Sequence, residues 1–550
     1  MKRLLTCVLL AMALLPAAAQ NSAHNAETAK QLSIFNNLYK ELDLNYVDTL
    51  DAKDVIEDAI YYLLERLDPY TDYYPADRTE DLRQMTTGKY AGIGSLIIYH
   101  AGHDRCIISE PYAGMPAAEA GLRRGDVIVA IDGQEMPRCG GRQRTAYSDS
   151  VSSTLRGEPG TTLRLRVERF GESAPLDFTL TRRTIALPAV RFAEMINDSV
   201  ALVAVSQFTE NTAAEVQRAL TELRAKGMKR LVLDLRGNPG GLMMEAVKLV
   251  GLFVPKGSEV VSTRGKVSSR NETFRTTGVP MTTDMPIVVL TDYGTASAGE
   301  ITAGALQDYD RAVIVGQRTY GKGLVQEPHE LLYGGVLKLT TCKYYIPSGR
   351  CVQAYEFSDG LPQHLADSVS REFHTKGGRP VRDCGGVTPD VEVVVDSLPN
   401  LITYLAVSDQ LSDFVARYRS THATIAPAET FSLTAAEYDD LTNFLKTSGF
   451  TYDRQSSYAL KLLRDIAEHE GYAEQARAEF DALEQKFTHN EDYDYRRWEP
   501  EIRRVVEDAI LTDYYYQRGG IVYDLRVSPE VRRALEILGD MESYRRILRP

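Results

Sequence analysis

The chain has 550 residues, of which 43% are hydrophobic and 25% are charged, and its formal net charge at pH 7 is −13. This composition is typical of a globular protein and excludes a largely disordered chain, and the length predicts three or four domains of about 100–200 residues. The acidic balance, without any basic cluster interleaved with aromatic residues, argues against nucleic acid as a partner.

Residues 1–19 have the pattern of a cleaved signal peptide. Lys2 and Arg3 precede an apolar stretch over residues 4–15, and the alanines at 17–19 offer a small-residue cleavage site before Gln20. The apolar stretch is short for a stable membrane span, although an uncleaved anchor is the alternative interpretation. We therefore expect export to the bacterial periplasm or cell envelope, with no requirement for membrane association.

The next two segments differ in their periodicity. Residues 28–88 repeat apolar side chains at spacings of three and four, which predicts a helical arm. Residues 89–187 change to short apolar stretches between glycine turns, which is typical of a small β domain. Strands are expected at 95–99, 106–109, 127–131, 162–169 and 176–180, and short helices at 117–122 and 147–155.

Residues 188–397 alternate continuous apolar strands with helices, which predicts a parallel α/β core. Strands are expected at 200–205, 231–235, 286–290 and 313–315, and helices at 212–227, 242–252 and 298–306. Thr212 and Glu215 have the spacing of a capping box that would open the first of these helices. Residues 398–550 are helical in pattern and carry no chemical motif. The fold class expected is therefore multidomain α+β, with a helical C-terminal extension.

The cysteines do not predict a disulfide framework or a metal site. Five of them remain beyond the signal peptide, an odd number, and no CxxC pair occurs. A bridge between Cys351 and Cys384 stays open for an oxidising compartment. No metal and no cofactor are expected.

A candidate nucleophile lies where a buried strand meets a helix. The strand at 286–290 is followed by a turn of small residues, and the next helix begins at Ser297. Small neighbours leave the serine hydroxyl accessible, and a helix start offers unpaired backbone N–H groups, notably that of Ala298, to a developing oxyanion. Taken alone, the serine is more typical of a plain helix N-cap.

A lysine is the candidate base, because none of the nine histidines lies in a motif-like setting. Lys322 stands between Gly321 and Gly323, which would let the backbone pass close to the nucleophile. A lysine can act as a general base when desolvation lowers its pKa. Gln326, four residues on, would hold the amine without adding charge. A lone Gly-Lys-Gly is otherwise typical of a solvated turn.

A third motif, DLRGNPGG at 234–241, lies between a strand and a helix. Its consecutive glycines let backbone N–H groups approach a ligand closely, so that Gly240 or Gly241 would supply a second oxyanion donor. An ordinary strand-to-helix turn explains the same glycines equally well in isolation.

Together these segments resemble the carboxyl-terminal processing peptidases, a serine protease family with a Ser/Lys dyad. The resemblance spans residues 28–395 and rests on five blocks in the family's order: DLRGNPGG at 234–241, GTASAGE at 294–300, YGKGLVQ at 320–326, YYIPSGR at 344–350 and GGVTPD at 385–390. One departure is Gly299, where many relatives have serine.

The resemblance implies a catalytic core of the ClpP/crotonase-like type in residues 188–397. It also implies roles for the candidate residues: Ser297 as nucleophile, Lys322 as general base, Gln326 as the residue orienting that base, and Ala298 with Gly240 or Gly241 as the oxyanion hole. The extension at 398–550 lies outside the family core, so the resemblance implies nothing about its role.

The β domain at 89–187 resembles a PDZ domain. Gly92, Ile93 and Gly94 match a carboxylate-binding loop whose backbone N–H groups would bind a peptide C-terminus, and the stretch 116–133 matches the most recognisable stretch of PDZ domains. An extended peptide would add as a strand beside residues 95–99. The expected partners are protein or peptide substrates with free, apolar C-termini, and a homo-oligomer stays open.

The function expected is that of an exported serine endopeptidase that recognises C-terminal tails. The main alternative is a non-catalytic PDZ scaffold or holdase. A nucleotide site at 316–322 is excluded because Gly323 leaves no hydroxyl for magnesium and Pro328 precludes the long helix that a P-loop opens. The chain also lacks the HExxH motif of many metalloproteases.

Overall fold

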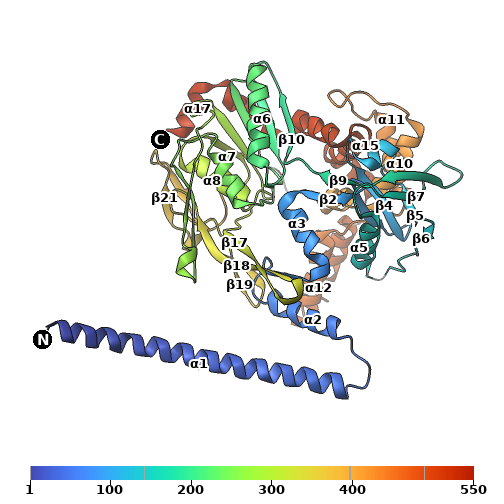
Figure 1. Ribbon diagram of the computed structural model, residues 1–550. Coiled ribbons are helices and arrows are strands. Elements are labelled where there is room, and N and C mark those ends of the chain that lie inside the picture. The colour runs from blue at the N-terminus through green and yellow to red at the C-terminus, as the bar shows by residue number, and fades with distance from the viewer. Residues whose placement is uncertain (1, 142, 395–397, 488–489, 550) are drawn as a thin grey trace. The chain divides into compact units, whose positions relative to one another are not determined.

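The computed structural model describes residues 2–141, 143–394, 398–487 and 490–549 (Figure 1). The chain divides into two compact units. The first comprises Met1–Tyr74, Pro328–Leu339 and Phe357–Pro362, and the second comprises Pro75–Glu327, Thr340–Glu356 and Gln363–Pro550. Met1, where the expected signal peptide begins, and residue 397, where the expected peptidase domain ends, lie outside the described residues.

The first unit is built mainly from two helices. Helix α1 (Lys2–Asn45) is a single long helix, drawn in dark blue in Figure 1, and α2 (Ala52–Glu65) begins after Asp51, whose carboxylate accepts the N–H groups of Lys53 and Asp54. Strand β1 (Asp72–Tyr74) pairs antiparallel with the first residues of β18 (Val336–Tyr345). The expected helical arm is confirmed for these helices, but β1 interrupts it, and α3 (Thr79–Thr87) belongs to the second unit.

The PDZ-like β domain lies in the second unit, and its five expected strands are confirmed. They form one antiparallel sheet in the order β3-β4-β5-β7-β8, with β6 added at β5. The bounds are β3 (Ser95–His100), β4 (Arg105–Pro111), β5 (Val127–Ile131), β6 (Gln134–Glu135), β7 (Thr162–Glu168) and β8 (Leu176–Thr181). Helices α4 (Pro116–Ala120) and α5 (Arg144–Leu155) accompany them, and β2 (Lys89–Gly92) pairs with β9 (Arg183–Ala186).

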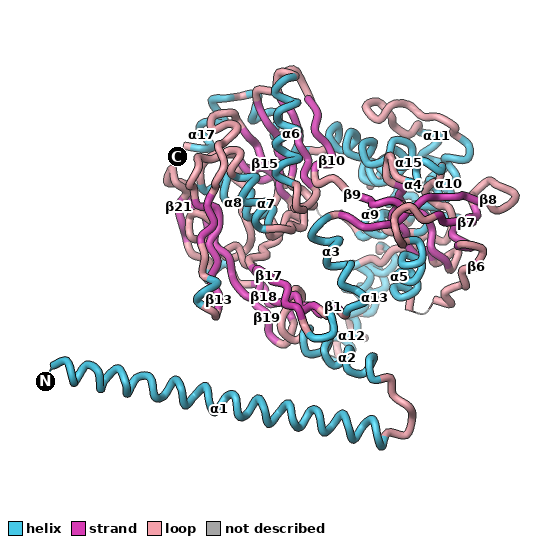
Figure 2. Tube along the Cα trace, in the orientation of Figure 1, coloured by secondary structure: helices cyan, strands magenta, loops and turns pink. Residues whose placement is uncertain are grey.

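The α/β domain contains a six-stranded sheet in the order β10-β11-β12-β15-β16-β23. All neighbouring strands are parallel except the edge strand β10, as expected for an α/β core. The bounds are β10 (Val190–Met195), β11 (Val200–Val205), β12 (Arg230–Asp234), β15 (Ile287–Thr291), β16 (Val313–Gly316) and β23 (Val391–Glu392). Figure 2 shows helices α6 (Thr212–Ala225), α7 (Met243–Val250) and α8 (Ala298–Asp308) beside these strands.

The two faces of this sheet are buried by different parts of the chain. One set of strand side chains, including Leu233 and Val289, packs with residues of α6, α7 and α8. The alternate set, including Val232 and Val288, packs with α16 (Pro529–Gly539) and α17 (Met541–Leu548). A parallel sheet is stable only when both faces are covered. The last helices of the C-terminal extension therefore complete the core around this sheet.

Tyr544 on α17 forms hydrogen bonds with β15, an inner strand of the sheet. Its hydroxyl donates to the carbonyl oxygen of Ile287 at 3.1 Å and accepts the N–H of the same residue at 3.0 Å. Both partners are buried, so these hydrogen bonds satisfy backbone groups at the start of β15 that water does not reach.

The remainder of the extension forms a helical domain with its own core. Helix α15 (Glu499–Val527) breaks at Tyr516, where φ is +57°. The helices are α9 (Asn400–Ala406), α10 (Asp409–Thr421), α11 (Ala435–Thr447), α12 (Gln455–Glu470), α13 (Arg477–Lys486), α14 (Glu491–Arg497) and α15 (Glu499–Val527).

Other strands are β13 (Glu259–Gly265), β14 (Thr273–Arg275), β17 (Leu324–Glu330), β19 (Tyr355–Ser358), β20 (Leu361–His364), β21 (Glu372–His374) and β22 (Pro380–Arg382).

The expected capping box at the start of α6 is wrong. Thr212 is already the first helical residue, and its hydroxyl accepts the N–H of Thr209 at 2.8 Å. Glu215 instead accepts the N–H of Val190 at 3.0 Å, on the neighbouring strand β10. The Glu215 carboxylate, which a capping box would bind to the backbone at the start of α6, therefore binds the backbone of a neighbouring strand instead.

The cysteines and the helices bear on two further points of the sequence analysis. Cys351 and Cys384 are both free, although the backbone N–H of Cys384 donates to the carbonyl oxygen of Cys351 at 3.1 Å. Within the described ranges, no helix combines the length and hydropathy that crossing a bilayer requires.

Candidate active site

Ser297 is the N-cap residue of α8, and the turn at 292–296 connects it to the end of β15. Its backbone has φ +51° and ψ −112°, a conformation that a residue with a side chain rarely adopts. Such a backbone costs of the order of 1–3 kcal/mol and persists only where the surroundings impose it. The serine is half-buried, so its side chain is partly accessible to solvent.

The helix that follows Ser297 is unusually enclosed. All of α8 is buried, so the helix lies inside the core and cannot shift without repacking it. Tyr344 donates its hydroxyl to the carbonyl oxygen of Ser297 at 3.2 Å. Burial raises the pKa of Tyr344 well above its usual range, so this hydroxyl stays protonated as a donor.

Glu300 connects the serine to the lysine loop. Its Oε2 atom accepts the backbone N–H of Ser297 at 2.9 Å and that of Lys322 at 2.8 Å. Its Oε1 atom accepts the N–H of Gly321 at 2.7 Å and the hydroxyl of Thr319 at 2.6 Å. A single carboxylate therefore holds the backbones of the two candidate catalytic residues beside each other.

Complete burial raises the pKa of Glu300, and the hydrogen bonds from Thr319 and the three backbone N–H groups oppose that rise. The sequence interpretation did not single out Glu300. The signal was present, because a serine at the N-cap with glutamate three residues later has the spacing of a capping box. Only the contacts with the loop at 319–322 show that this glutamate does more than cap α8.

The loop that carries Lys322 needs its two glycines. Gly321 has φ +87°, and a Cβ atom there would lie 2.4 Å from the Cβ of Ala354. A Cβ at Gly323 would lie 2.7 Å from the backbone nitrogen of Gln353. Lys322 itself is half-buried. Gln326 lies on β17, where its Nε2 donates to the hydroxyl of Thr340 at 3.1 Å.

The DLRGNPGG loop packs directly on Ser297. A Cβ atom at Gly240 would lie 2.7 Å from the Cβ of Ser297 and 3.0 Å from the nitrogen of Ala298. Asn238 fixes this contact, because its carbonyl oxygen accepts the N–H of Ala296 at 2.9 Å and its Oδ1 accepts the N–H of Gly240 at 2.9 Å. The Gly240 amide is thus engaged within its own loop, whereas Gly241 is exposed to solvent.

The same loop is bound to the C-terminal extension through Arg236. The guanidinium lies 2.7 Å from Asp234, the last residue of β12, and 2.7 Å from Asp524 on α15. It also donates to the hydroxyl of Ser528 at 2.9 Å and lies 3.4 Å from Glu530 on α16. Although burial opposes it, these carboxylates raise the pKa of Arg236, which therefore stays charged.

A cavity of about 1160 Å³ adjoins this loop. Gly237 and Gly294 line it from the catalytic core, Arg124 from the PDZ-like domain, and Asp508 and Asp524 from α15. All three parts of the second unit therefore meet beside the loop that packs on Ser297.

The PDZ-like domain carries a separate groove. Strand β3 is at the edge of its sheet, so one side of it is available for an added strand. A cavity of about 220 Å³ lies between β3 and α5, with Ile93, Ile97, Ser152 and Leu155 among its lining residues.

The predicted carboxylate loop lies at the end of this groove. Gly92 ends β2, and Ile93 and Gly94 form the short connection to β3. Gly94 has φ +72°, and a Cβ atom there would lie 2.4 Å from the Cβ of Met115. The turn therefore requires glycine at this position.

Sequence comparisons place these features in a known class of enzyme. The family description "Peptidase family S41" matches residues 199–362, "PDZ domain" matches residues 107–169, and "Probable PDZ-protease, C-terminal helical domain" matches residues 401–538. The chain is a serine-type peptidase with a PDZ domain.

Two curated relatives identify the family more closely. A carboxy-terminal-processing protease of Bartonella bacilliformis is 36% identical over 341 residues, which are 61% of this chain and 76% of that protein. A carboxyl-terminal-processing protease of Synechocystis is 38% identical over 295 residues, which are 52% of this chain and 66% of that protein. The chain belongs to the carboxy-terminal-processing proteases of peptidase family S41.

Among solved structures, a photosystem II D1 C-terminal processing protease is 28% identical, with a TM-score of 0.36. The match covers 66% of this chain and 87% of that one.

Proposed function

We propose that this peptidase is an exported endopeptidase in which Ser297 and Lys322 form the catalytic pair. The observation that carries the proposal is the hydrogen bonding of Glu300, whose one oxygen accepts the N–H groups of both residues. A nucleophile and its base must lie within reach of each other, and a shared carboxylate keeps their backbones adjacent.

In the proposed reaction, neutral Lys322 accepts the hydroxyl proton as Ser297 Oγ bonds to the carbonyl carbon of the scissile peptide. The ammonium then returns the proton to the departing amine as the C–N bond breaks and an acyl-enzyme remains. A water molecule, deprotonated by the same lysine, releases the acyl group and regenerates the serine. Gln326 orients the amine, and its Nε2 hydrogen bond to Thr340 would hold its side chain in place.

The proposed oxyanion hole combines the N–H groups of Ala298 and Gly241. Ala298 is the first residue of α8, where a backbone N–H has no partner inside the helix. Gly241 is favoured over Gly240 as the second donor because the Gly240 amide already donates to Asn238. Each such donor is worth about 10²–10³ in kcat.

The proposal includes selection of substrates by their C-terminal tails. The open edge of β3 would accept the tail as an added strand, the loop at Gly92, Ile93 and Gly94 would bind the terminal carboxylate, and the cavity beside Ile97 and Leu155 would take an apolar last side chain. The partners proposed are therefore proteins with free, apolar C-termini.

The experiment that tests the chemistry compares digestion of an unfolded protein by the wild type, Ser297→Ala and Lys322→Ala. Both variants should lose activity while keeping the melting temperature within a few degrees. Ser457→Ala and Lys461→Ala, which remove the same side chains from the exposed face of α12, should remain fully active. Wild-type activity in either Ser297→Ala or Lys322→Ala would reject the dyad.

Export to the periplasm or cell envelope rests on the pattern of residues 1–19. Expression in a bacterium, followed by cell fractionation and N-terminal sequencing, should give a periplasmic or envelope-associated chain that starts at Gln20. A chain that keeps Met1 and stays in the cytoplasm would contradict this part of the proposal.

A further inference from the structure

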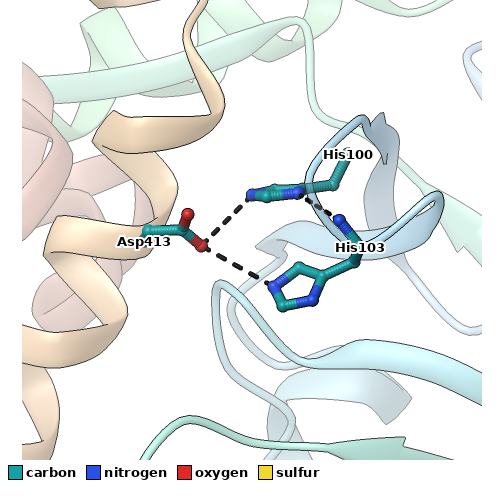
Figure 3. Close-up of side chains that lie close together, drawn as sticks. All are labelled: His100, His103 and Asp413. Atoms are coloured by element: carbon teal, nitrogen blue, oxygen red, sulfur yellow. Dashed lines mark hydrogen bonds and ion pairs between the residues drawn. The ribbon is translucent and has the colours of Figure 1, made fainter. Parts of the chain in front are cut away.

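Two histidines and an aspartate converge outside the active site (Figure 3). His100 ends β3, His103 lies in the following turn, and Asp413 lies on α10 of the helical domain. Their side-chain ligand atoms all lie within 4.8 Å of one another. Both imidazole rings point at the same carboxylate, and neither the proposed catalysis nor the proposed tail binding uses any of the three.

We propose that His100, His103 and Asp413 form a binding site for a divalent transition metal such as Zn²⁺. Two imidazoles and a carboxylate are typical zinc ligands. With metal–ligand bonds of about 2.0–2.1 Å, two ligands at a tetrahedral angle lie about 3.4 Å apart. The Nε2 atoms of His100 and His103 lie 3.1 and 3.8 Å from Asp413 Oδ1, on either side of that value.

Small side-chain rotations are enough to complete the site. His103 and Asp413 are 43% and 40% exposed, so both can adjust without disturbing the core, whereas His100 is 2% exposed and acts as the fixed ligand. The exposure also leaves the fourth coordination position open to water. A three-ligand site of this kind resembles open rather than closed zinc sites in its ligand count.

Asp409 supplies the outer partner that metal-binding histidines usually have. It lies one helical turn before Asp413 on α10, and its Oδ2 is 3.6 Å from His100 Nδ1. The same oxygen accepts the N–H of Ala101 at 2.7 Å, which fixes the turn between the histidines. A carboxylate at the second ring nitrogen orients the imidazole and increases its basicity as a ligand.

Metal binding would change the tautomer of His100. Without metal, the N–H of His103 donates to His100 Nδ1 at 3.2 Å, and Nε2 donates its proton to Asp413. With a metal on Nε2, the ring proton moves to Nδ1 and faces Asp409, and the hydrogen bond from His103 is lost.

The consequence of occupancy is a link between two domains. His100 ends β3 and His103 lies in the β3–β4 turn of the PDZ domain, whereas Asp413 belongs to the helical domain. Because β3 is the strand beside which a substrate tail is proposed to add, a bound metal would hold that strand's far end against α10. The metal site itself does not depend on the proposed catalytic pair.

The test is calorimetric titration of Zn²⁺ into the purified full chain, without a histidine tag, after treatment with EDTA and dialysis. The wild type should bind one equivalent saturably. His103→Ala and Asp413→Asn should abolish that binding, and Asp409→Asn should weaken it by ~10–100-fold. His469→Ala, which removes an exposed imidazole from α12, is the matched control and should bind like the wild type.

Two further readouts separate a metal site from a hydrogen-bonded cluster. Co²⁺ should give the absorption of a four-coordinate complex in the wild type and not in His103→Ala. Zn²⁺ should also slow hydrogen exchange in the turn at 101–104 of the wild type alone. The proposal is overturned if the wild type shows no saturable one-to-one binding, or if His103→Ala and Asp413→Asn, with unchanged melting temperatures, bind Zn²⁺ as well as the wild type.

Discussion

Glu300 is hydrogen-bonded to Ser297, three residues earlier in the chain: its Oε2 atom accepts the backbone N–H of that serine at 2.9 Å. The contact holds Ser297 in its positive-φ conformation, and the remaining hydrogen bonds of the carboxylate attach the loop at 319–322 to the same point. The start of α8 and the lysine loop are therefore bound to the same carboxylate.

Glu300→Gln should sharply reduce activity. An amide offers one acceptor oxygen in place of two, so its NH₂ group would face N–H donors that the carboxylate now satisfies. We expect kcat to fall by ~10²-fold, as for a catalytic group displaced by about 1 Å. Stability should fall by about 1–3 kcal/mol for the buried donors left unpaired.

Steady-state kinetics and thermal unfolding measure these two effects. Glu222→Gln, on the exposed face of α6, is the matched control and should leave both unchanged. A wild-type kcat in Glu300→Gln would show that the shared carboxylate does not position the catalytic pair.

Asp524→Asn should slow catalysis from the helical extension. Asp524 lies 2.7 Å from Arg236, whose loop packs on Ser297, and also 2.9 Å from Arg504. Losing this charge leaves the guanidinium with the carboxylates of Asp234 and Glu530 and the hydroxyl of Ser528, which loosens the loop that carries Gly241. We expect kcat to fall several-fold with KM little changed, because the loop is proposed to act on the transition state.

Asp465→Asn, an exposed charge removal on α12, should have no effect on kcat. An equal kcat for Asp524→Asn and the wild type, in correctly folded protein, would mean that the extension covers the sheet without influencing the active site.

Peptides that differ only at their C-terminus should be cleaved at different rates. A free carboxylate can bind the N–H groups of the loop at 92–94, whereas an amidated tail has no negative charge to bind there. We expect kcat/KM to fall when the tail is amidated or ends in Asp-Asp in place of apolar residues. Equal values for matched free and amidated peptides would remove the PDZ domain from substrate selection.

Asp508 should make the stability of the protein depend on pH. Burial, followed by the nearby charge of Asp524, raises the pKa of Asp508 to about 6, with Arg124 and Arg504 opposing and Glu110 reinforcing the rise. An unfolded aspartate has a pKa of about 3.9, so between these values the folded chain binds more protons and loses stability as pH rises. The ionised carboxylate is thus unfavourable in the folded protein at neutral pH.

Asp508→Asn removes this titration. Its melting temperature should exceed that of the wild type at pH 8, and the two should converge as pH falls to 4, where the wild-type carboxyl is protonated in the folded protein. Thermal unfolding over this range measures the difference. A constant difference between the two proteins at every pH would exclude titration of Asp508 as the cause.

Local sequence patterns were sufficient to predict the elements that carry the site. The strand over 200–205 and the strand over 127–131 are confirmed residue for residue, because continuous apolar stretches between turn residues have few other solutions. The start of α8 at Ala298, directly after Ser297, follows in the same way from small residues behind a buried strand. The order of five motifs was enough to indicate the family.

The tertiary structure alone decided which partners these elements have. Glu215 has the spacing of a helix cap but binds Val190, and Glu300 has the same spacing but also binds the loop at 319–322. Arg236 reaches Asp524, and Tyr544 reaches Ile287, across more than 250 intervening residues. Periodicity and capping motifs describe interactions between near neighbours in the chain. A buried carboxylate or guanidinium takes whichever donors or acceptors the packing brings to it, because leaving it unpaired costs more than abandoning a local motif.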